Sequence, residues 1–318
     1  MNKLFRFVVA VVIVFAAPPS FAADEQKSIL VTGASTGIGR HLTETLAGNG
    51  YHVYAGARKD ADLAELDAIE NVTAVRLDVT KQDQVDAAVE LIKNKGTGLY
   101  ALVNNAGVGG GGPIVDTPIE DQTFVYKVNV EGVYRTTKAF APMVIESKGR
   151  IITTGSIAGT GSAIPGFGAY SGSKHWIEAF TDSFATEMEP LGVMVSVVEP
   201  GNYKSHIRRS SAARRIEKAK AAEGGISEEM KQAYDKTAER ELSYKEPDEV
   251  SEAFMHALFD DKPLRRYMVV PNEGEQQWTI RTQINELVQL NTWGPDSYTR
   301  DQLVEMLDEA LVGDTLEQ

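Results

Sequence analysis

Short apolar segments alternate with longer amphipathic segments along most of this 318-residue chain. From Ser28 onward, seven apolar runs have the length and composition of buried strands: 29–31, 51–54, 72–77, 99–103, 151–152, 193–198 and 267–270. The segments between them carry apolar residues at helical spacing, as Val85, Val89 and Ile92 do. Strands that alternate with helices predict an α/β fold, with a doubly wound parallel sheet of about seven strands and helices on both faces.

Two regions depart from this alternation. Residues 204–245, here called the lid, are charged and rich in alanine, and predict one or two exposed helices over a substrate site. Residues 273–318 predict a helical C-terminal extension, with a capping box at Thr299 and Gln302. Its first helix carries one apolar stripe at Ile284, Leu287, Val288 and Leu290. Because no internal repeat or long linker interrupts residues 23–272, we expect them to form one domain.

The first 22 residues have the layout of a secretory signal peptide. Lys3 and Arg6 precede an apolar run over 7–17, and small residues at 20–22 favour cleavage after Ala22. Eleven apolar residues are short for a membrane span, so a permanent anchor is the weaker interpretation. The expected location is a bacterial periplasm or a eukaryotic lumen. The remaining alternative is a cytoplasmic protein whose fold begins with a hydrophobic segment.

Composition excludes several classes of function. Hydrophobic residues make up 42% of the chain and charged residues 24%, which is typical of a globular protein. The chain has no cysteine, so it has neither disulfides nor thiolate metal ligands, and no metal site is predicted. A formal net charge of −13 argues against non-specific binding to nucleic acid or to anionic membranes.

A glycine-rich segment, Thr32 to Gly39, follows the first predicted strand and opens a helix. Glycines at such a turn let the backbone approach a pyrophosphate, which the free N–H groups and the dipole of the helix N-terminus would bind. The residues expected to bind the cofactor here are Gly33, Ser35, Thr36, Gly37, Ile38 and Gly39. Alone, the segment could also be a purely steric turn.

Four motifs in order carry a family resemblance. They are the glycine segment 32–39, Asn104-Asn105-Ala106-Gly107 after the fourth strand, Ser156 after the fifth, and Tyr170 with Lys174 four residues later. Together they resemble the short-chain dehydrogenase/reductase family over about residues 28–270. The resemblance implies a Rossmann-type fold and hydride transfer between a nicotinamide dinucleotide and an alcohol or carbonyl substrate.

The resemblance also implies further contacts with the cofactor. Asp78 would hydrogen-bond the adenine. Asn104 and Gly107, together with Ala106, would line the floor under the adenosine ribose. Pro200, Gly201 and Ser205 would contact the nicotinamide carboxamide, with serine in place of the usual threonine.

The end of the second predicted strand bears on cofactor choice. An acidic residue there would bind the ribose 2′-hydroxyl of NAD(H), whereas this chain has Arg58 and Lys59 and no carboxylate in the segment 56–59. A guanidinium can make a forked contact with a 2′-phosphate, which favours NADP(H) over NAD(H). The alternative is that both cations are simply solvated on a loop.

The chemistry is expected at Ser156, Tyr170 and Lys174. Tyr170 and Lys174 lie four apart, hence on one face of a helix, and Ser156 ends a strand at the sheet edge where ligands bind. Tyr170 would be the general acid and base, with Lys174 and an oxidised nicotinamide favouring its phenolate. Ser156 would polarise the substrate oxygen. Tyr170 and Lys174 are also expected to contact the cofactor, Lys174 through the nicotinamide ribose.

The family pattern adds a fourth catalytic residue and a mode of assembly. Asn129 matches the asparagine that would hold a water between Lys174 and solvent. The helices that carry Asn129 and Tyr170 often form subunit interfaces in this family, which implies a homodimer or homotetramer.

The substrate pocket has no recognisable motif. Gly109–Gly112 predicts a flexible loop beside the site, and Ile164, Pro165 and Phe167 could form an apolar wall. Seven basic residues over Lys204–Lys220 indicate either attraction of an anion or, the favoured interpretation, a solvated helix face.

The expected function is therefore an NADP(H)-dependent alcohol dehydrogenase or carbonyl reductase with a moderately apolar substrate. Two other functions remain open. One is a non-catalytic NAD(P)-binding redox sensor, and the other is an epimerase or dehydratase with the same fold.

Overall fold

The computed structural model describes residues 26–161, 164–221 and 225–317. The predicted signal peptide, residues 1–22, lies outside the described residues. Among the residues described, no helix is long and apolar enough to cross a membrane.

A parallel sheet forms the centre of the molecule, and its seven strands in the described chain have the order β3-β2-β1-β4-β5-β6-β7. All of its neighbouring strands run parallel. The strands are β1 (Ser28–Val31), β2 (His52–Ala57), β3 (Val72–Arg76), β4 (Ala101–Asn104), β5 (Arg150–Thr154), β6 (Met194–Pro200) and β7 (Arg266–Val269). Each overlaps one of the seven apolar runs, so the predicted Rossmann-type fold is confirmed.

Helices cover both faces of the sheet because successive strand residues point to opposite sides. In β1, Ile29 and Val31 face one core, whereas Leu30 faces the other. The first core is closed by α1 (Gly37–Gly48), α2 (Asp60–Asp67) and α9 (Asp248–Phe259). The second is closed by α3 (Gln82–Lys95), α5 (Val133–Glu146) and α6 (Gly168–Met188). A helix α4 (Ile119–Tyr126) leads into α5 through a π-helical turn, Lys127–Gly132.

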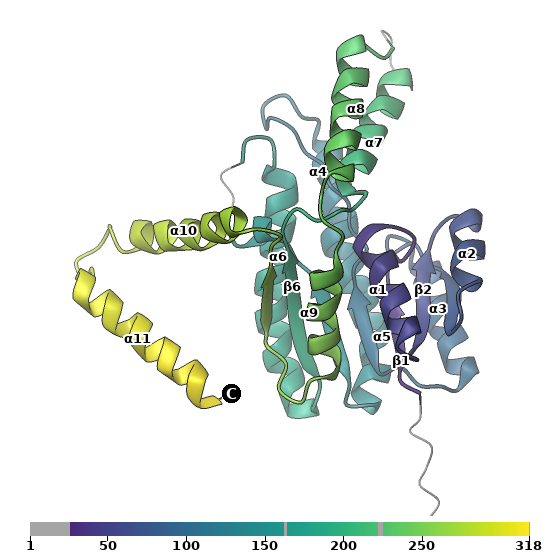
Figure 1. Cartoon of the computed structure of the whole chain (residues 1–318), viewed down its shortest axis with the longest axis horizontal. Helices are drawn as coiled ribbons and strands as arrows, with labels where there is room; N and C mark the ends of the chain where they lie inside the picture. The colour runs from purple at the N-terminus through teal and green to yellow at the C-terminus, as the bar shows by residue number, and fades with distance from the viewer. Residues whose placement is uncertain (1–25, 162–163, 222–224, 318) are drawn as a thin grey trace, which may run out of the picture.

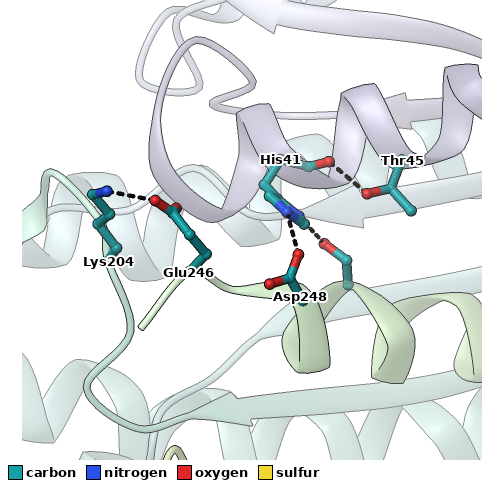
Figure 2. Close-up of polar contacts among 6 residues, drawn as sticks. His41, Thr45, Lys204, Glu246 and Asp248 are labelled. Atoms are coloured by element: carbon teal, nitrogen blue, oxygen red, sulfur yellow. Dashed lines mark hydrogen bonds and ion pairs between the residues drawn. The ribbon is translucent and has the colours of Figure 1, made fainter. Parts of the chain in front are cut away.

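The lid is a helical hairpin of α7 (Ile207–Ala221) and α8 (Glu228–Leu242) that projects beyond the carboxyl edge of the sheet (Figure 1). The sequence predicted one or two helices here, and the structure has two. Its ends are tied to each other where they join the body. Lys204 forms an ion pair with Glu246, and the Lys204 N–H donates to the Lys245 carbonyl at 2.8 Å. Just beyond, His41 of α1 contacts Asp248 at 3.0 Å (Figure 2).

The C-terminal extension consists of α10 (Glu273–Leu290) and α11 (Arg300–Glu317), which form an open V beside the body (Figure 1). The predicted capping box is present: Gln302 Oε1 accepts from the Thr299 N–H at 2.9 Å, and Thr299 Oγ1 accepts from the Gln302 N–H at 3.3 Å. The predicted stripe is also present on α10, and its members are exposed to solvent.

Two glycines of the same helix provide a matched test of the packing that positions the first turn of α1. A Cβ at Gly39 would overlap Asn105 Nδ2 and the Gly33 carbonyl oxygen, whereas a Cβ at Gly48 would meet no atom within 4 Å. We expect Gly39→Ala to lower the free energy of unfolding by about 1–3 kcal/mol because the neighbours must move. Gly48→Ala should leave it unchanged or raise it by up to about 1 kcal/mol. Denaturant unfolding measures both, and equal stability of the two variants would contradict this account.

Candidate active site

The loops that follow β1 and β4 are locked together at the centre of the carboxyl edge. Thr32 Oγ1 accepts hydrogen bonds from the N–H groups of Asn105 and Ala106, both at 3.0 Å. Asn105 Nδ2 donates to the carbonyls of Thr32 at 3.0 Å and Gly33 at 3.2 Å. The strand order reverses between β1 and β4, so these loops flank the crevice where α/β sheets bind ligands.

The glycine segment has the shape that a pyrophosphate needs. Gly33 and Gly37 have φ of +66° and +58°, a left-handed conformation that favours glycine. A Cβ at Gly33 would lie 2.8 Å from the Ala106 Cα, so only glycine allows this close approach. The first turn of α1 directs its free N–H groups at the same space. The backbone therefore leaves room for an anionic group at a helix N-terminus, as a dinucleotide requires.

A single pocket brings together most of the predicted cofactor-binding residues with the catalytic side chains. From the predicted set it is lined by Gly33, Ser35, Thr36, Gly37, Ile38, Gly39, Arg58, Asp78, Ala106, Gly107, Ser156, Tyr170, Lys174, Pro200, Gly201 and Ser205. Most of these residues follow the ends of β1 to β6, which are distant in sequence, and Tyr170 and Lys174 come from α6. Two predicted residues, Asn104 and Asn129, do not line it.

The predicted contact between Asn104 and the cofactor is corrected by the position of its side chain. Its side chain is buried, donates to Thr137 Oγ1 at 2.9 Å and accepts from Thr136 Oγ1 at 2.6 Å. As the last residue of β4, it points toward α5 rather than into the pocket. The following residue, Asn105, lines the pocket instead. Asn104 therefore joins β4 to α5, and the floor of the pocket is built from Asn105, Ala106 and Gly107.

Asp78 lies on the pocket wall just after β3. Its Oδ1 accepts from the backbone N–H of Thr80 at 2.9 Å and from the Thr80 hydroxyl at 2.8 Å. The carboxylate therefore stabilises the turn that it lies on. Its contact with adenine stays a prediction.

Ser156, Tyr170 and Lys174 converge from two neighbouring elements. Ser156 follows β5, and Tyr170 and Lys174 lie in the first two turns of α6. Lys174 is buried, and its Nζ donates to the Thr154 carbonyl at 2.7 Å. The same Nζ lies 5.8 Å from the centre of the Tyr170 ring. This carbonyl therefore holds the ammonium in place beneath the phenol.

Asn129 lies in the π-helical turn and is buried. Its Oδ1 accepts from the Val108 N–H at 2.9 Å, and its Nδ2 donates to the Val108 carbonyl and to Ser173 Oγ, both at 3.0 Å. It therefore joins the loop after β4 to α6. A Cβ at Gly107 would lie 3.5 Å from Asn129 Oδ1 and 3.9 Å from Lys174 Nζ, so both side chains approach this glycine. The role of Asn129 in holding a water stays a prediction.

Burial controls the electrostatics of the site. It raises the pKa of Tyr170, opposed by a hydrogen bond with Ser156 and by the charge of Arg208. Burial also lowers the pKa of Lys174 to about 8, opposed by Glu178. The lowering of the Tyr170 pKa that Lys174 and an oxidised nicotinamide are together expected to give stays a prediction. The Lys174 ammonium is itself desolvated, and it is directed at the Thr154 carbonyl.

A cluster of charged side chains around the buried Glu199 was not predicted from the sequence. Glu178, one turn after Lys174, and Glu199 of β6 face each other next to Arg266 of β7. Arg266 Nε lies 3.1 Å from Glu178 Oε2, and its Nη2 lies 2.6 Å from Asp182 Oδ2. Glu178 lies four residues after Lys174, so the sequence could have suggested that the two side chains are close. Glu199 and Arg266 lie on other strands, and only the folded sheet brings them to Glu178.

The raised pKa of Glu199 leads to a prediction of how the stability of the protein changes with pH. Burial, and then the charge of Glu178, raise the pKa of Glu199 from 4.5 to about 8. Between these pH values the folded protein binds a proton that the unfolded chain releases, so the contribution of Glu199 to stability falls as pH rises. Glu199→Gln is neutral at every pH. We therefore expect its melting temperature to match that of the native protein near pH 5 and to exceed it increasingly up to about pH 8.

Glu252→Gln, an exposed substitution on α9, is the control and should give a small shift that does not change with pH. A Glu199→Gln difference that is constant across the pH range would contradict the raised pKa of this carboxyl.

Comparisons with known proteins agree with this geometry. The family model described as short chain dehydrogenase matches residues 27–216. The mitochondrial D-beta-hydroxybutyrate dehydrogenase of Mus musculus is 34% identical over 282 residues, which cover 82% of this chain and 81% of the relative.

Two solved structures are similar over most of their length. A short-chain dehydrogenase/reductase from Burkholderia phymatum in complex with NAD has a TM-score of 0.70 and 25% identity, covering 86% of this chain and 98% of the other. An alcohol dehydrogenase from the archaeon Thermococcus sibiricus, complexed with 5-hydroxy-NADP, has a TM-score of 0.60 and 26% identity. It covers 76% of this chain and 95% of the other.

Proposed function

This chain belongs to the short-chain dehydrogenase/reductase family and is an NAD(P)-dependent oxidoreductase, and we propose that it reduces a carbonyl substrate with NADP(H) through Tyr170. The observation that carries the proposal is the position of Ser156 and Tyr170. Both line the cofactor pocket, and both also line a second, larger cavity beneath the lid. A substrate oxygen bound between these hydroxyls would lie where the two spaces meet.

Each catalytic side chain has a role that follows from its surroundings. The bound cofactor would supply or accept the hydride at its nicotinamide. The Ser156 hydroxyl would donate a hydrogen bond to the substrate oxygen and stabilise the negative charge that develops there. The Tyr170 phenol would give that oxygen a proton. Because burial raises the pKa of Tyr170, the phenol is protonated at neutral pH, which is the state that reduction needs.

The Lys174 ammonium would support this proton transfer electrostatically. Its Nζ donates a hydrogen bond to the Thr154 carbonyl, which holds the ammonium inside the site. A cation there would stabilise the phenolate that remains after the proton leaves. With a pKa of about 8, Lys174 is largely protonated at neutral pH and can fill this role.

Removing the Tyr170 hydroxyl tests the mechanism. We expect Tyr170→Phe to lower NADPH-dependent reduction by roughly 10²- to 10⁴-fold, because the acid that protonates the substrate oxygen is lost. NADPH affinity, measured by fluorescence titration, should change little. Tyr134→Phe is the control, since Tyr134 is an exposed tyrosine on α5.

Equal turnover by Tyr170→Phe and the native protein would reject Tyr170 as the acid. Other outcomes favour the alternatives. A redox sensor would bind NADPH and reduce none of a broad panel of ketones and aldehydes, and an epimerase or dehydratase would convert substrate without net oxidation of NADPH.

The preference for NADP(H) is supported by two arginines that line one pocket. Arg58 follows β2, and Arg214 reaches the same pocket from α7. Burial, and then the charge of Arg58, lower the pKa of Arg214, so the two guanidiniums are close enough to repel each other. The nearest acid in sequence, Asp60, is paired with Arg76. A 2′-phosphate would relieve the repulsion between the two cations, whereas the ribose hydroxyl of NAD(H) would not.

Substituting Arg58 tests the cofactor preference. We expect Arg58→Gln to weaken NADPH binding roughly 10- to 100-fold, because a charge-assisted contact with phosphate is lost. NADH binding should be unchanged. Lys59→Gln, the neighbouring substitution outside the pocket, should affect neither cofactor. Native protein that binds NADH as tightly as NADPH would show that this preference is wrong.

Export and self-association remain proposals. The charge and apolar pattern of residues 1–22 supports export to a periplasm or lumen, and the family pattern supports a homodimer or homotetramer.

A further inference from the structure

The cavity beneath the lid has a volume of about 610 Å³ and a mixed lining. Ser156 and Tyr170 lie at one end of it. Apolar side chains form much of the wall, among them Ile157, Ile164, Phe167 and Trp278. The predicted glycine loop Gly109–Gly112 forms another side. The cavity is therefore large enough for a substrate with an apolar body, and its polar lining determines which other groups of a substrate it can bind.

Arginines on the lid helices give the cavity an unbalanced positive charge. Arg208 and Arg215 of α7 and Arg240 of α8 line it, and within the described part of the chain none of their guanidinium groups lies within 4 Å of a carboxylate. The protein has 45 acidic residues against 32 lysines and arginines, so partners are abundant.

Three of the four lysines on the lid helices are paired, and none of these four lysines lines the cavity. Lys218 pairs with Asp121, Lys220 with Glu217 and Lys231 with Glu228. The fourth, Lys236, and Arg209 of α7 form no ion pair within the described residues, so unpaired cations also lie outside the cavity.

Two carboxylates also line the cavity, but both bind backbone groups. Glu241 accepts from the N–H groups of Arg208 at 2.7 Å and Arg209 at 3.2 Å, at the start of α7. Glu275 accepts from the Asn202 N–H at 2.8 Å. Neither forms an ion pair with a lining arginine, so guanidinium donors remain for a ligand.

Arg208 is the arginine closest to the chemistry. It is half-buried, and its Nη2 donates to Asn202 Oδ1 at 2.8 Å, which uses one of five N–H donors. Its Cζ lies 5.5 Å from the centre of the Phe167 ring, and that ring stands edge-on to Tyr170 at 6.3 Å. The charge of Arg208 also acts on Tyr170. An anion bound at Arg208 would thus lie about one aromatic ring away from the reacting phenol.

A second donor in the cavity has no partner. The Tyr244 hydroxyl is buried, and it makes no hydrogen bond with any described residue. Buried hydroxyls are nearly always satisfied in folded proteins, so an orphan that lines a cavity points to a ligand acceptor.

We propose that this cavity binds an oxo or hydroxy acid, whose carboxylate is held by Arg208 and Tyr244 while its reacting carbon lies at Tyr170. Arg215 and Arg240 are exposed and would attract the anion electrostatically. The apolar wall would bind the carbon chain. A carboxylate is favoured over a phosphate because one half-buried guanidinium and one phenol match a monoanion. This proposal rests on the proposed reduction and specifies its class of substrate.

Pairs of substrates that differ only in charge provide the test. NADPH oxidation is measured with a panel of oxo acids, with the methyl ester of each acid and with phosphate-bearing ketones. We expect the acids to be reduced with a higher kcat/KM than their esters. Arg208→Gln should lower kcat/KM for the acids roughly 30- to 100-fold, because a charge-assisted hydrogen bond is lost. The esters control for an indirect effect on Tyr170 and should lose much less.

Arg209→Gln is the matched control. It removes the same charge at the next position of α7, and its side chain does not line the cavity. We expect it to leave both classes of substrate unaffected.

Binding without turnover gives an independent measurement. Trp278 lines the cavity, so its fluorescence should respond when a saturated alkanoate, which cannot be reduced, is added to the full-length protein. We expect Arg208→Gln and Tyr244→Phe to weaken this binding and Arg209→Gln to leave it unchanged. Alkanols of equal length should bind equally to all four proteins.

Esters that are reduced as efficiently as their acids would overturn the proposal. So would a preference for phosphate-bearing ketones, or an Arg208→Gln variant that loses acids and esters alike. Failure of the proposed function has a different signature, since no carbonyl compound, charged or neutral, would then be reduced.

Discussion

The parallel direction of all the strands in the described sheet is the constraint on which the site depends. Because these strands end at the same edge, the loops after β1 to β6 meet there although they are distant in sequence. The reversal of strand order between β1 and β4 opens the crevice, and the bonds between Thr32, Asn105 and Gly33 fix its two sides. The glycines at this edge are needed because backbone and side chains of the neighbouring loop occupy the space of a Cβ.

Burial then decides what the side chains at this edge can do. Tyr170 and Lys174 are both desolvated, so each pKa moves toward the neutral form of its group. The phenol keeps its proton, and the ammonium depends on the Thr154 carbonyl and on the nearby Glu178 for its charge. The lid continues this arrangement, since Arg208 brings a positive charge to the same phenol from the substrate side. The proposed catalytic and recognition groups thus act on the same phenol.

Local sequence patterns predicted the fold and the central residues of the site. They could not predict contacts between residues that only the folded sheet brings together. Apolar runs revealed the strands, and the four-residue spacing placed Tyr170 and Lys174 on one face of α6. The motif around Asn104 was recognised, but which asparagine faces the pocket depends on how β4 ends, and Asn105 takes that position. Glu199 and Arg266 reach Glu178 from other strands. The basic run of the lid was visible in the sequence, yet only the folded hairpin shows that Arg208 and Arg240 line the cavity and that the lysines of its helices do not.

The central claim is that Tyr170 and Ser156 face a carbonyl that receives a hydride from a nicotinamide in the glycine-lined pocket. The most direct test uses NADPH that carries deuterium at both C4 positions of the nicotinamide, with an oxo acid as substrate and mass spectrometry of the product. The account predicts one deuterium on the carbinol carbon of the product from the native protein, and product formation that collapses in Tyr170→Phe. Product without deuterium, or deuterated product formed equally fast by the variant, would contradict it.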